Sequence, residues 1–486
     1  MWQPPNLVTM QPVSVSRIIE KSVESNRFPW VIGVFLYTFS YGFMFGFLDA
    51  YFWDDWYVNV ELTKVEAHQY WRDQLGFFPT NRFIEISLLD RNPVLFHLLT
   101  FAIFFLIPVI VFAIAKCFKL ISQEQRFYLT VILLVLPINS ARVSMAVFRL
   151  SYSFLIFLVA WLILVHPRTA KVKYLATPLF VVSFLSQSLI PFFVLPCLHN
   201  LYLGFDRKNQ RWKSKTLFHV SYLSLAPLYL LIAWMFDPPV EAQRDYFTPS
   251  FSGVARAILL LVAVCSIFVW SVIKAHADEE HRKTNILFSL SFLVIAFGAA
   301  AYIASGRLVD ISEWMLNFVP RASDWDSRHQ LLLGVGIALF VSTLLMTIEK
   351  SVRRRVFVGF IAVCVVLNFS MLQGYYFDAQ KQNEVVSILS KLDDISEWKS
   401  VVVADEADVY NARNRGVRSY EWEQMIVKAG GNKDVAVVTS VQPCATEQNQ
   451  VSAVYLLVES SQGRFTSMLK GGVGLTIRAT SVSICP

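Results

Sequence analysis

The chain has 486 residues, of which 55% are hydrophobic and only 16% are charged. A mean hydropathy of +0.48 excludes an ordinary soluble enzyme. It predicts a polytopic α-helical membrane protein, because apolar segments near the ~20 residues that cross a bilayer recur along the chain. The net charge of +7 does not indicate nucleic-acid binding, since the basic residues cluster in short loops, as membrane orientation requires.

Residues 1–27 form a polar segment without the pattern of a removed signal peptide, and we expect it in the cytoplasm. Residues 28–372 alternate apolar runs with polar loops, which predicts about eleven transmembrane helices. One run is too short for a full crossing, and a long one breaks near Gln187, where two short helices meet. The runs lie near 28–48, 94–115, 127–137, 150–165, 174–205, 216–236, 256–274, 284–304, 330–348 and 356–372.

The polar stretch 49–93 separates the first two predicted spans. Its segments KVEAHQYWRDQL and RFIEISLLDRNPV are amphipathic when drawn as helices, which is typical of helices that lie on a membrane surface. We therefore expect interfacial helices in this loop.

The basic residues of the loops indicate which side of the membrane each loop faces. Alternating sides from a cytoplasmic N-terminus bring all the basic clusters to one side, and the positive-inside bias makes that side the cytoplasm. The 49–93 loop and the C-terminal tail then face outside. The clusters are Lys116/Lys119/Arg126, Arg168/Lys171/Lys173, Arg207 to Lys215, Lys274/Arg282/Lys283 and Arg353 to Arg355.

Residues 373–486 have a different composition and predict a small extracytoplasmic α/β domain. QNEVVSILSKL and YEWEQMIVKAG have helical patterns, whereas VVVADE, AVVTSV, AVYLLVES and GLTIRATSVSI have the patterns of strands. Cys444 and Cys485 are its only cysteines. They could pair in an oxidising compartment, and two free thiols are the alternative.

The acidic pair Asp54 and Asp55 directly follows the first apolar run and stands beside Trp56. Carboxylates are costly in hydrocarbon, so a pair at a helix mouth lies in water or in a site. One of the two could accept a proton from an incoming hydroxyl group as a general base. A solvated acidic turn with an interfacial aromatic belt is the alternative.

Several arginines on the same side could bind phosphate, for which the planar guanidinium is well suited. Arg82 and Arg91 lie in the 49–93 loop, where a cation at the headgroup level is the alternative. Arg142 and Arg149 are seven residues apart and would share one face of a helix. In an apolar setting they need a partner, either a lipid phosphate or an outer carboxylate.

Other polar and aromatic side chains, Trp56 of the acidic motif among them, could contact a sugar or an acceptor. Gln187 is expected to face inward at the break, although it could equally bond backbone groups freed there. Trp314, Trp325 and His329 lie in a late outer loop, and an interfacial tryptophan belt is the alternative reading. The chain has no HExxH, GxSxG, P-loop or Rossmann motif, which argues against a metal-dependent phosphotransferase domain, a serine hydrolase and a nucleotide-binding domain. Because a lipid phosphate is a competent leaving group, we expect no metal or other cofactor.

Taken together, this pattern resembles the GT-C superfamily of membrane glycosyltransferases. The resemblance rests on WDDW after the first helix, on GFFPTNRF before the second, and on the architecture of the whole chain. Within the superfamily the chain is most similar to the serotype-converting O-antigen glucosyltransferases of temperate phages and their enterobacterial relatives. Related enzymes often carry Gly-Arg-Pro after the acidic motif, where this chain has Asn81-Arg82-Phe83.

The resemblance implies an inverting transfer of a hexose, glucose above all, from undecaprenyl phosphate to a lipid-linked or surface polysaccharide such as the O-antigen of lipopolysaccharide. It implies a multi-pass protein of the bacterial inner membrane whose site faces the periplasm, working with a donor synthase and a flippase. Asp54 or Asp55 would be the base, Arg82, Arg91, Arg142 and Arg149 would hold the lipid phosphate, and aromatic residues would contact the sugars. An O-antigen polymerase, and a lipid or polysaccharide transporter, are the alternatives.

Overall fold

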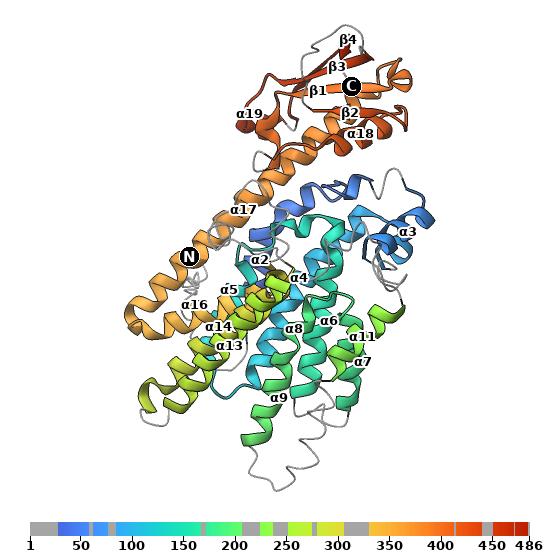
Figure 1. Ribbon diagram of the computed structural model, residues 1–486. Coiled ribbons are helices and arrows are strands. Elements are labelled where there is room, and N and C mark those ends of the chain that lie inside the picture. The colour runs from blue at the N-terminus through green and yellow to red at the C-terminus, as the bar shows by residue number, and fades with distance from the viewer. Residues whose placement is uncertain are drawn as a thin grey trace, which may run out of the picture.

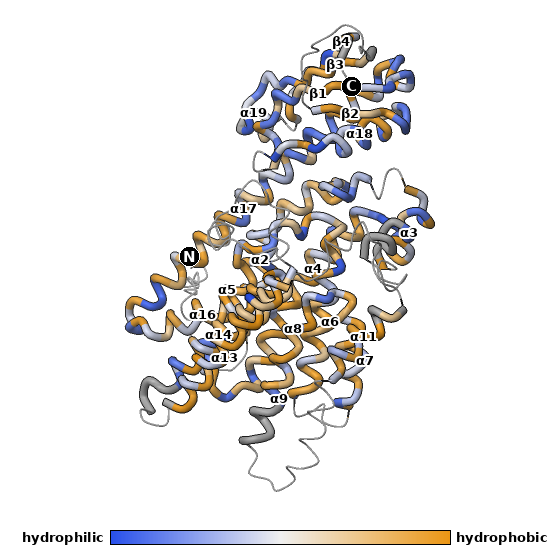
Figure 2. Tube along the Cα trace, viewed as in Figure 1, coloured by the Kyte–Doolittle hydropathy of each residue, from blue (hydrophilic) through white to orange (hydrophobic). Residues whose placement is uncertain are grey.

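The computed structural model is largely helical and carries a small four-stranded sheet at its C-terminal end (Figure 1). Hydrophobic residues dominate the helical body, whereas the C-terminal domain mixes hydrophobic and hydrophilic residues (Figure 2). The structure describes residues 28–57, 62–75, 84–166, 172–206, 224–236, 251–274, 279–305, 330–412, 415–439, 451–470 and 472–484.

Five helices in the described residues are long and apolar enough to cross a membrane. All five coincide with predicted spans, and helices of this length and composition are those of a membrane protein. They are α4 (Pro93–Lys116), α6 (Phe148–Val165), α13 (Phe251–Lys274), α14 (Glu279–Ala304) and α17 (Lys350–Leu389).

The other predicted spans correspond to shorter helices where they are described. The region broken at Gln187 forms three pieces, with α8 between the two short helices that were expected. These shorter helices are α2 (Trp30–Tyr41), α5 (Gln123–Val135), α7 (Ala176–Ser183), α8 (Leu189–Phe192), α9 (Val194–Asp206), α11 (Leu225–Phe236) and α16 (Leu333–Thr347).

Local sequence signals explain where α4 begins. Asn92 caps the helix, because its side-chain oxygen accepts hydrogen bonds from the backbone N–H groups of Val94 and Leu95. Pro93 occupies the first helical position, where a missing N–H costs nothing. The helix therefore starts abruptly at the end of the 49–93 loop and holds that loop at the edge of the helical body.

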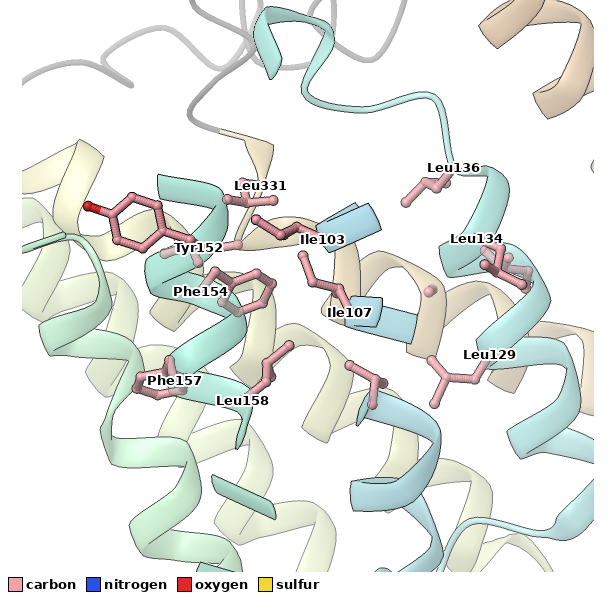
Figure 3. Close-up of a cluster of buried hydrophobic side chains, with 14 of the residues drawn as sticks. Ile103, Ile107, Leu129, Leu134, Leu136, Tyr152, Phe154, Phe157, Leu158 and Leu331 are labelled. Carbon is pink, nitrogen blue, oxygen red and sulfur yellow. The ribbon is translucent and has the colours of Figure 1, made fainter. Parts of the chain in front are cut away.

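The core of the helical body is built from aliphatic and aromatic side chains of α4, α5 and α6 (Figure 3). Ile103, Ile107, Leu129, Phe154 and Phe157 are all buried there. By contrast, α13 exposes most of its apolar side chains, and so large an apolar surface is matched by lipid rather than by water. The exposed residues include Ile258, Leu259, Val262, Ile267, Val269, Trp270 and Ile273.

The long helix α17 connects the helical body to the C-terminal domain (Figure 1). At 1.5 Å per residue its 40 residues extend about 60 Å, roughly twice the thickness of the hydrocarbon core. The domain boundary expected between residues 372 and 373 falls inside this helix. The last predicted span and the predicted helix QNEVVSILSKL are thus one continuous element.

The C-terminal domain has the predicted strands and helix. Its sheet has the order β2-β1-β3-β4, in which β1 pairs in parallel with β2 and β3, while β3 and β4 are antiparallel. Val401, Val403 and Leu456 are buried in its core. The elements are β1 (Ser400–Asp405), α18 (Ser419–Lys428), β2 (Ala436–Val438), β3 (Val451–Ser460), α19 (Arg464–Lys470) and β4 (Leu475–Ile484).

Only one of the two predicted interfacial helices forms as expected. The segment KVEAHQYWRDQL is α3 (Lys64–Leu75). In the described part of RFIEISLLDRNPV, the short π-helical turn η4 (Ile84–Leu88) is the one helical piece before α4 begins at Pro93. Asp90 and Arg91 then adopt positive φ angles, which end any helix there. An ion pair between Lys64 and Asp90 connects the two segments.

Candidate functional site

Asp55 is buried beneath the turn at residues 139–147, which consists of η5 (Ser140–Val143) and η6 (Met145–Val147). Its carboxylate accepts hydrogen bonds of 2.9 Å from Ser144 Oγ and from the backbone N–H groups of Met145 and Ala146. The backbone N–H of Phe52 donates a further bond of 3.3 Å. Asp55 therefore fastens the first loop to this turn.

Burial sets the protonation of Asp55. Removal from water disfavours the carboxylate and raises the pKa to about 7, although the four hydrogen bonds oppose the shift. Asp55 is 2% exposed, and both of its carboxylate oxygens accept hydrogen bonds from the protein, so its role is structural. It has little room to receive a proton from a substrate.

Asp54 occupies a different environment, because it is only partly buried. Tyr420 Oη, on α18 of the C-terminal domain, donates a hydrogen bond of 3.2 Å to Asp54 Oδ1. Among the described residues this is the one hydrogen bond of the carboxylate. The two adjacent acids therefore differ: Asp55 supports the loop, and Asp54 keeps an oxygen that can accept a proton.

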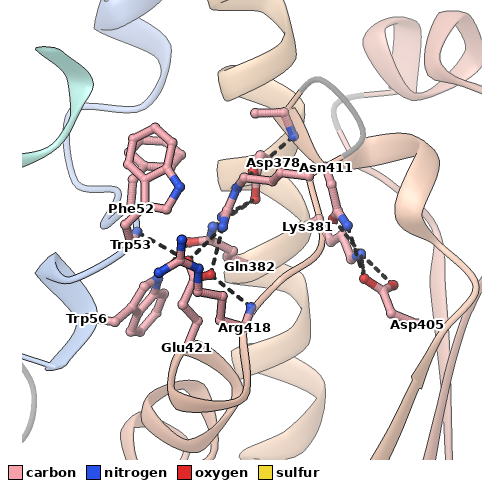
Figure 4. A network of polar contacts seen from close by, with 12 residues as sticks. Phe52, Trp53, Trp56, Asp378, Lys381, Gln382, Asp405, Asn411, Arg418 and Glu421 are labelled. Carbon is pink, nitrogen blue, oxygen red and sulfur yellow. Dashed lines mark hydrogen bonds and ion pairs between the residues drawn. The ribbon is translucent and has the colours of Figure 1, made fainter. Parts of the chain in front are cut away.

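A buried ionic network joins the first loop to the C-terminal domain (Figure 4). Arg415 donates through Nε to Asp378 at 2.9 Å and through Nη1 to both oxygens of Glu421 at 2.8 and 2.7 Å. Burial disfavours the Arg415 cation, but the charges of the two carboxylates outweigh this effect and raise its pKa. Glu421 also accepts the backbone N–H of Trp53 at 3.2 Å.

Trp53 has a positive φ of 53°, which is strained for so bulky a residue. Such conformations cost on the order of 1–3 kcal/mol and persist only where the surroundings impose them. Here Glu421 holds the Trp53 backbone, and the Arg415 guanidinium lies 5.6 Å from the indole centroid. The C-terminal domain thus determines the backbone conformation immediately before Asp54.

Trp56, which was predicted to contact a sugar, is 1% exposed. Its Nε1–H donates a hydrogen bond of 3.1 Å to Gln382 on α17 (Figure 4). Lys428 Nζ lies 5.2 Å from its ring centroid and 5.0 Å from that of Tyr51. Trp56 therefore belongs to the packed contact between loop, α17 and α18, and its ring face is covered.

Arg142 is 4% exposed and lies among aromatic rings of the helical body. Its guanidinium carbon is 3.8 Å from the ring centroid of Tyr41 and 4.6 Å from that of Phe104. The Nε and Nη2 atoms have no hydrogen-bond partner among the described residues. The sequence left two partners open for Arg142, a lipid phosphate or an outer carboxylate. Among the described residues, no carboxylate bonds these two nitrogens.

Other buried polar atoms without partners occur just before Arg142 on the same turn and on α4. Both side-chain polar atoms of Asn139 and the Oγ1 of Thr100 lack partners within the described ranges. His97 and Thr100 share a face of α4 with Phe104, which contacts Arg142. The ring nitrogens of His97 lie 2.9 Å from the carbonyl oxygen of Leu48 and 3.1 Å from that of Val143.

The expectation that Arg142 and Arg149 share one helical face is wrong. Ser144 is extended, with ψ of 135°, and ends η5 before η6 and α6 begin. Arg142 therefore lies in a 3-10 turn and Arg149 in the first turn of α6. Arg149 is partly buried near Tyr229.

Two of the remaining candidates, Arg91 and Gln187, lie in the described residues. Arg91 donates a hydrogen bond to the backbone carbonyl of Leu62 within its own loop. Gln187 is exposed at the helix break between α7 and α8. Outside the described residues lie Arg82, Trp314, Trp325, His329, Cys444 and Cys485.

The sequence alone did not reveal the residues that the C-terminal domain brings to the first loop. Asp378, Arg415, Tyr420 and Glu421 lie more than 300 residues after Asp54, and no spacing rule connects them. The only signal was YEWEQMIVKAG, a helix with acids and aromatics in its first turn. Within the described part of the chain, no group of histidine, cysteine and acidic side chains could hold a metal ion.

Comparison with known proteins assigns no family to this chain. No family model, no curated protein and no solved structure matches it.

Proposed function

We propose that the protein is an inverting glycosyltransferase. It moves a hexose, with glucose the first candidate, from a polyprenyl phosphate to a lipid-linked or surface polysaccharide such as O-antigen. In this proposal the chain is a GT-C protein of the bacterial inner membrane with about eleven crossings. Its site and its C-terminal domain face the periplasm, and a donor synthase and a flippase supply the lipid-linked sugar.

The observation that carries the proposal is the division of roles between two adjacent acids at the edge of an apolar helical body. Asp55 is engaged by four donors, whereas Asp54 is partly exposed and offers a carboxylate oxygen at the face covered by the C-terminal domain. A general base must be within reach of the acceptor hydroxyl and must be able to take its proton. Asp54 meets these demands better than its neighbour.

The donor is an anion, and the helical body contains a buried cation, Arg142, that has no anionic partner among the described residues. A buried, unpaired guanidinium is costly, and it favours a site that an anionic group fills during function. In the proposed reaction Arg142 stabilises the negative charge on the departing lipid phosphate. Asp55 holds the turn that carries Arg142, so the acidic motif and this cation belong to one assembly.

The test compares three substitutions of aspartate by asparagine in membranes supplied with radiolabelled undecaprenyl-phosphate glucose and a polysaccharide acceptor. Asp54→Asn lowers the transfer rate by about 10²–10⁴-fold, as expected for loss of a general base. Asp393→Asn, at an exposed acid of the C-terminal domain, is the matched control and keeps the wild-type rate. Wild-type transfer by Asp54→Asn would show that Asp54 is not the base.

Asp55→Asn separates support from chemistry. Because Asp55 holds the loop, this variant loses transfer together with thermal stability, whereas Asp54→Asn loses transfer with its unfolding midpoint nearly unchanged. If Asp55→Asn were as stable as wild type and inactive, the two roles would be exchanged.

A further inference from the structure

A side chain of the C-terminal domain, Tyr420, contacts the candidate base Asp54. Tyr420 Oη donates a hydrogen bond of 3.2 Å to Asp54 Oδ1, across 366 residues of sequence. Tyr420 is the second residue of α18, and both groups are partly buried. This contact brings a domain that the sequence separates from the helical body directly onto the acidic motif.

The contact is in register with a second one, so it is not an isolated surface hydrogen bond. Consecutive loop residues bond consecutive residues of α18: Trp53 N–H donates to Glu421, and Asp54 accepts from Tyr420. Glu421 is itself held by both Arg415 and the backbone N–H of Arg418. The buried network therefore determines where the Tyr420 phenol stands relative to Asp54.

Tyr420 has the protonation state that a donor needs. Burial raises the pKa of its phenol, and the negative charges of Asp54 and Glu421 raise it further. The phenol thus keeps its proton at neutral pH and donates a hydrogen bond to Asp54 Oδ1. The second oxygen, Oδ2, has no hydrogen-bond partner among the described residues and stays available.

We infer that Tyr420 is a positioning residue that holds Oδ1 of Asp54 and directs Oδ2 toward the acceptor hydroxyl. The C-terminal domain is then part of the reaction site. This inference rests on the proposed function, because it assigns Tyr420 a role in the same reaction.

In the reaction, the acceptor O–H bond breaks and its proton passes to Oδ2 of Asp54. The acceptor oxygen forms a bond to the anomeric carbon from the face opposite the donor phosphate. The bond from the anomeric carbon to the phosphate oxygen breaks, and its electron pair leaves with the polyprenyl phosphate. Tyr420 keeps its proton throughout and acts only through the orientation of Asp54.

The first experiment measures steady-state transfer from undecaprenyl-phosphate glucose by purified Tyr420→Phe. Loss of a hydrogen bond to a charged group lowers kcat on the order of tenfold, while KM stays within about twofold because Tyr420 does not bind substrate. Tyr410→Phe is the matched control. It removes a phenol that bonds Ser467 at 2.7 Å within the same domain, away from Asp54, and it leaves kcat unchanged.

A double substitution separates positioning from a general effect on folding. When Tyr420 acts through Asp54, Asp54→Asn combined with Tyr420→Phe is no slower than Asp54→Asn alone. Independent, multiplying losses in the double variant would overturn the inference.

A second measurement needs no activity. Carbodiimide with glycine ethyl ester labels accessible carboxyl groups, and peptide mass spectrometry reports the rate at Asp54. Tyr420→Phe raises this rate severalfold, whereas Tyr410→Phe does not. An unchanged labelling rate would mean that the phenol does not hold the carboxylate, and would overturn the inference even in a variant that folds poorly.

The outcomes distinguish this inference from the function on which it rests. A normal kcat in Tyr420→Phe, beside an inactive Asp54→Asn, would overturn the positioning role and leave the proposed function standing. Wild-type protein that transfers no sugar from polyprenyl-phosphate hexoses would overturn both.

Discussion

Arg415 and Arg142 are both buried, at 8% and 4% exposure, yet their surroundings differ in kind. Arg415 lies between the carboxylates of Asp378 and Glu421 and bonds both. Arg142 lies between two aromatic rings, and two of its nitrogens have no hydrogen-bond partner in the described residues. One arginine is satisfied by the protein, and the other is not.

The difference indicates what each residue is for. A buried ion pair with all its donors used contributes to a specific domain contact, and breaking it leaves charges stranded. A buried cation without an anion weakens the fold, since the rings supply only part of the lost hydration. Natural proteins keep such a group when a ligand needs it, which is the reason to propose that Arg142 binds the phosphate of the proposed donor.

The largest expected effect is on the satisfied side of this comparison. Arg415→Met strands Asp378 and Glu421 and lowers the free energy of unfolding by about 3–5 kcal/mol. Arg478→Met, which breaks an exposed pair with Glu459, costs less than about 1 kcal/mol and is the control. Equilibrium unfolding in detergent measures both. Equal losses would mean that the network contributes no more than a surface pair.

The second expected effect concerns Asp55, which holds the turn that carries Arg142. Its pKa is about 7 in the folded protein, above the ordinary value, so the folded state retains a proton that the unfolded chain releases. Its contribution to stability is therefore largest below about pH 4 and is lost as the pH rises through 7.

The measurement is the thermal midpoint of wild type and Asp55→Asn between pH 4.5 and 8. The stability advantage of wild type over the variant, which cannot titrate, shrinks with rising pH by on the order of a few kcal/mol. A constant difference over this range would contradict a raised pKa.

A smaller effect compares two buried tryptophans of the domain contact. Trp56→Phe removes the hydrogen bond to Gln382. The comparison is Trp398→Phe, because Trp398 is 3% exposed and its Nε1 has no partner in the described residues. Both substitutions remove ring volume, but only the first breaks a bond, so it is the more destabilising by about 1 kcal/mol. Chemical denaturation of the two variants measures the difference, and equal losses would leave the bond without a measurable contribution.

The smallest effect on stability is expected for the substitution of Arg142, although it is a buried charged residue. Arg142→Met replaces an unpaired buried cation by an apolar side chain of similar length, so the free energy of unfolding stays within about 1 kcal/mol of wild type or increases. Transfer from the lipid-linked donor falls in the same variant. A loss of stability as large as that of Arg415→Met would show that Arg142 has a structural partner.

Much of the local structure could be predicted from residue patterns. The apolar runs predict α4, α6, α13 and α14, and the amphipathic segment KVEAHQYWRDQL predicts α3. The strands of the C-terminal domain were equally visible, because short β-branched and apolar runs have few alternatives. These features depend on neighbours in sequence, which a pattern records.

Only part of the candidate site could be predicted from the sequence. The acidic pair, its position after the first apolar run and the arginine-bearing turn were recognised from sequence. The sequence did not reveal which acid keeps an open oxygen, since this depends on the donors that residues 144–146 give to Asp55 and that Tyr420 gives to Asp54, all from distant segments. The helix joining Arg142 to Arg149 was predicted wrongly, because the extended Ser144 follows from its contact with Asp55 and not from local propensity.

By itself, the sequence determined that the protein is a helical membrane protein with an acidic motif after its first apolar run and a small α/β domain at its end. Hydrophobicity and periodicity are summed over many neighbouring residues, so they survive without knowledge of the fold. Only the tertiary structure decided that Asp55 is buried and that Tyr420 contacts Asp54. It also decided that Arg415 is paired, whereas two nitrogens of Arg142 have no partner in the described part of the chain. Hydrogen bonds and burial are short-range in space, and these partners lie as much as 366 residues apart along the chain.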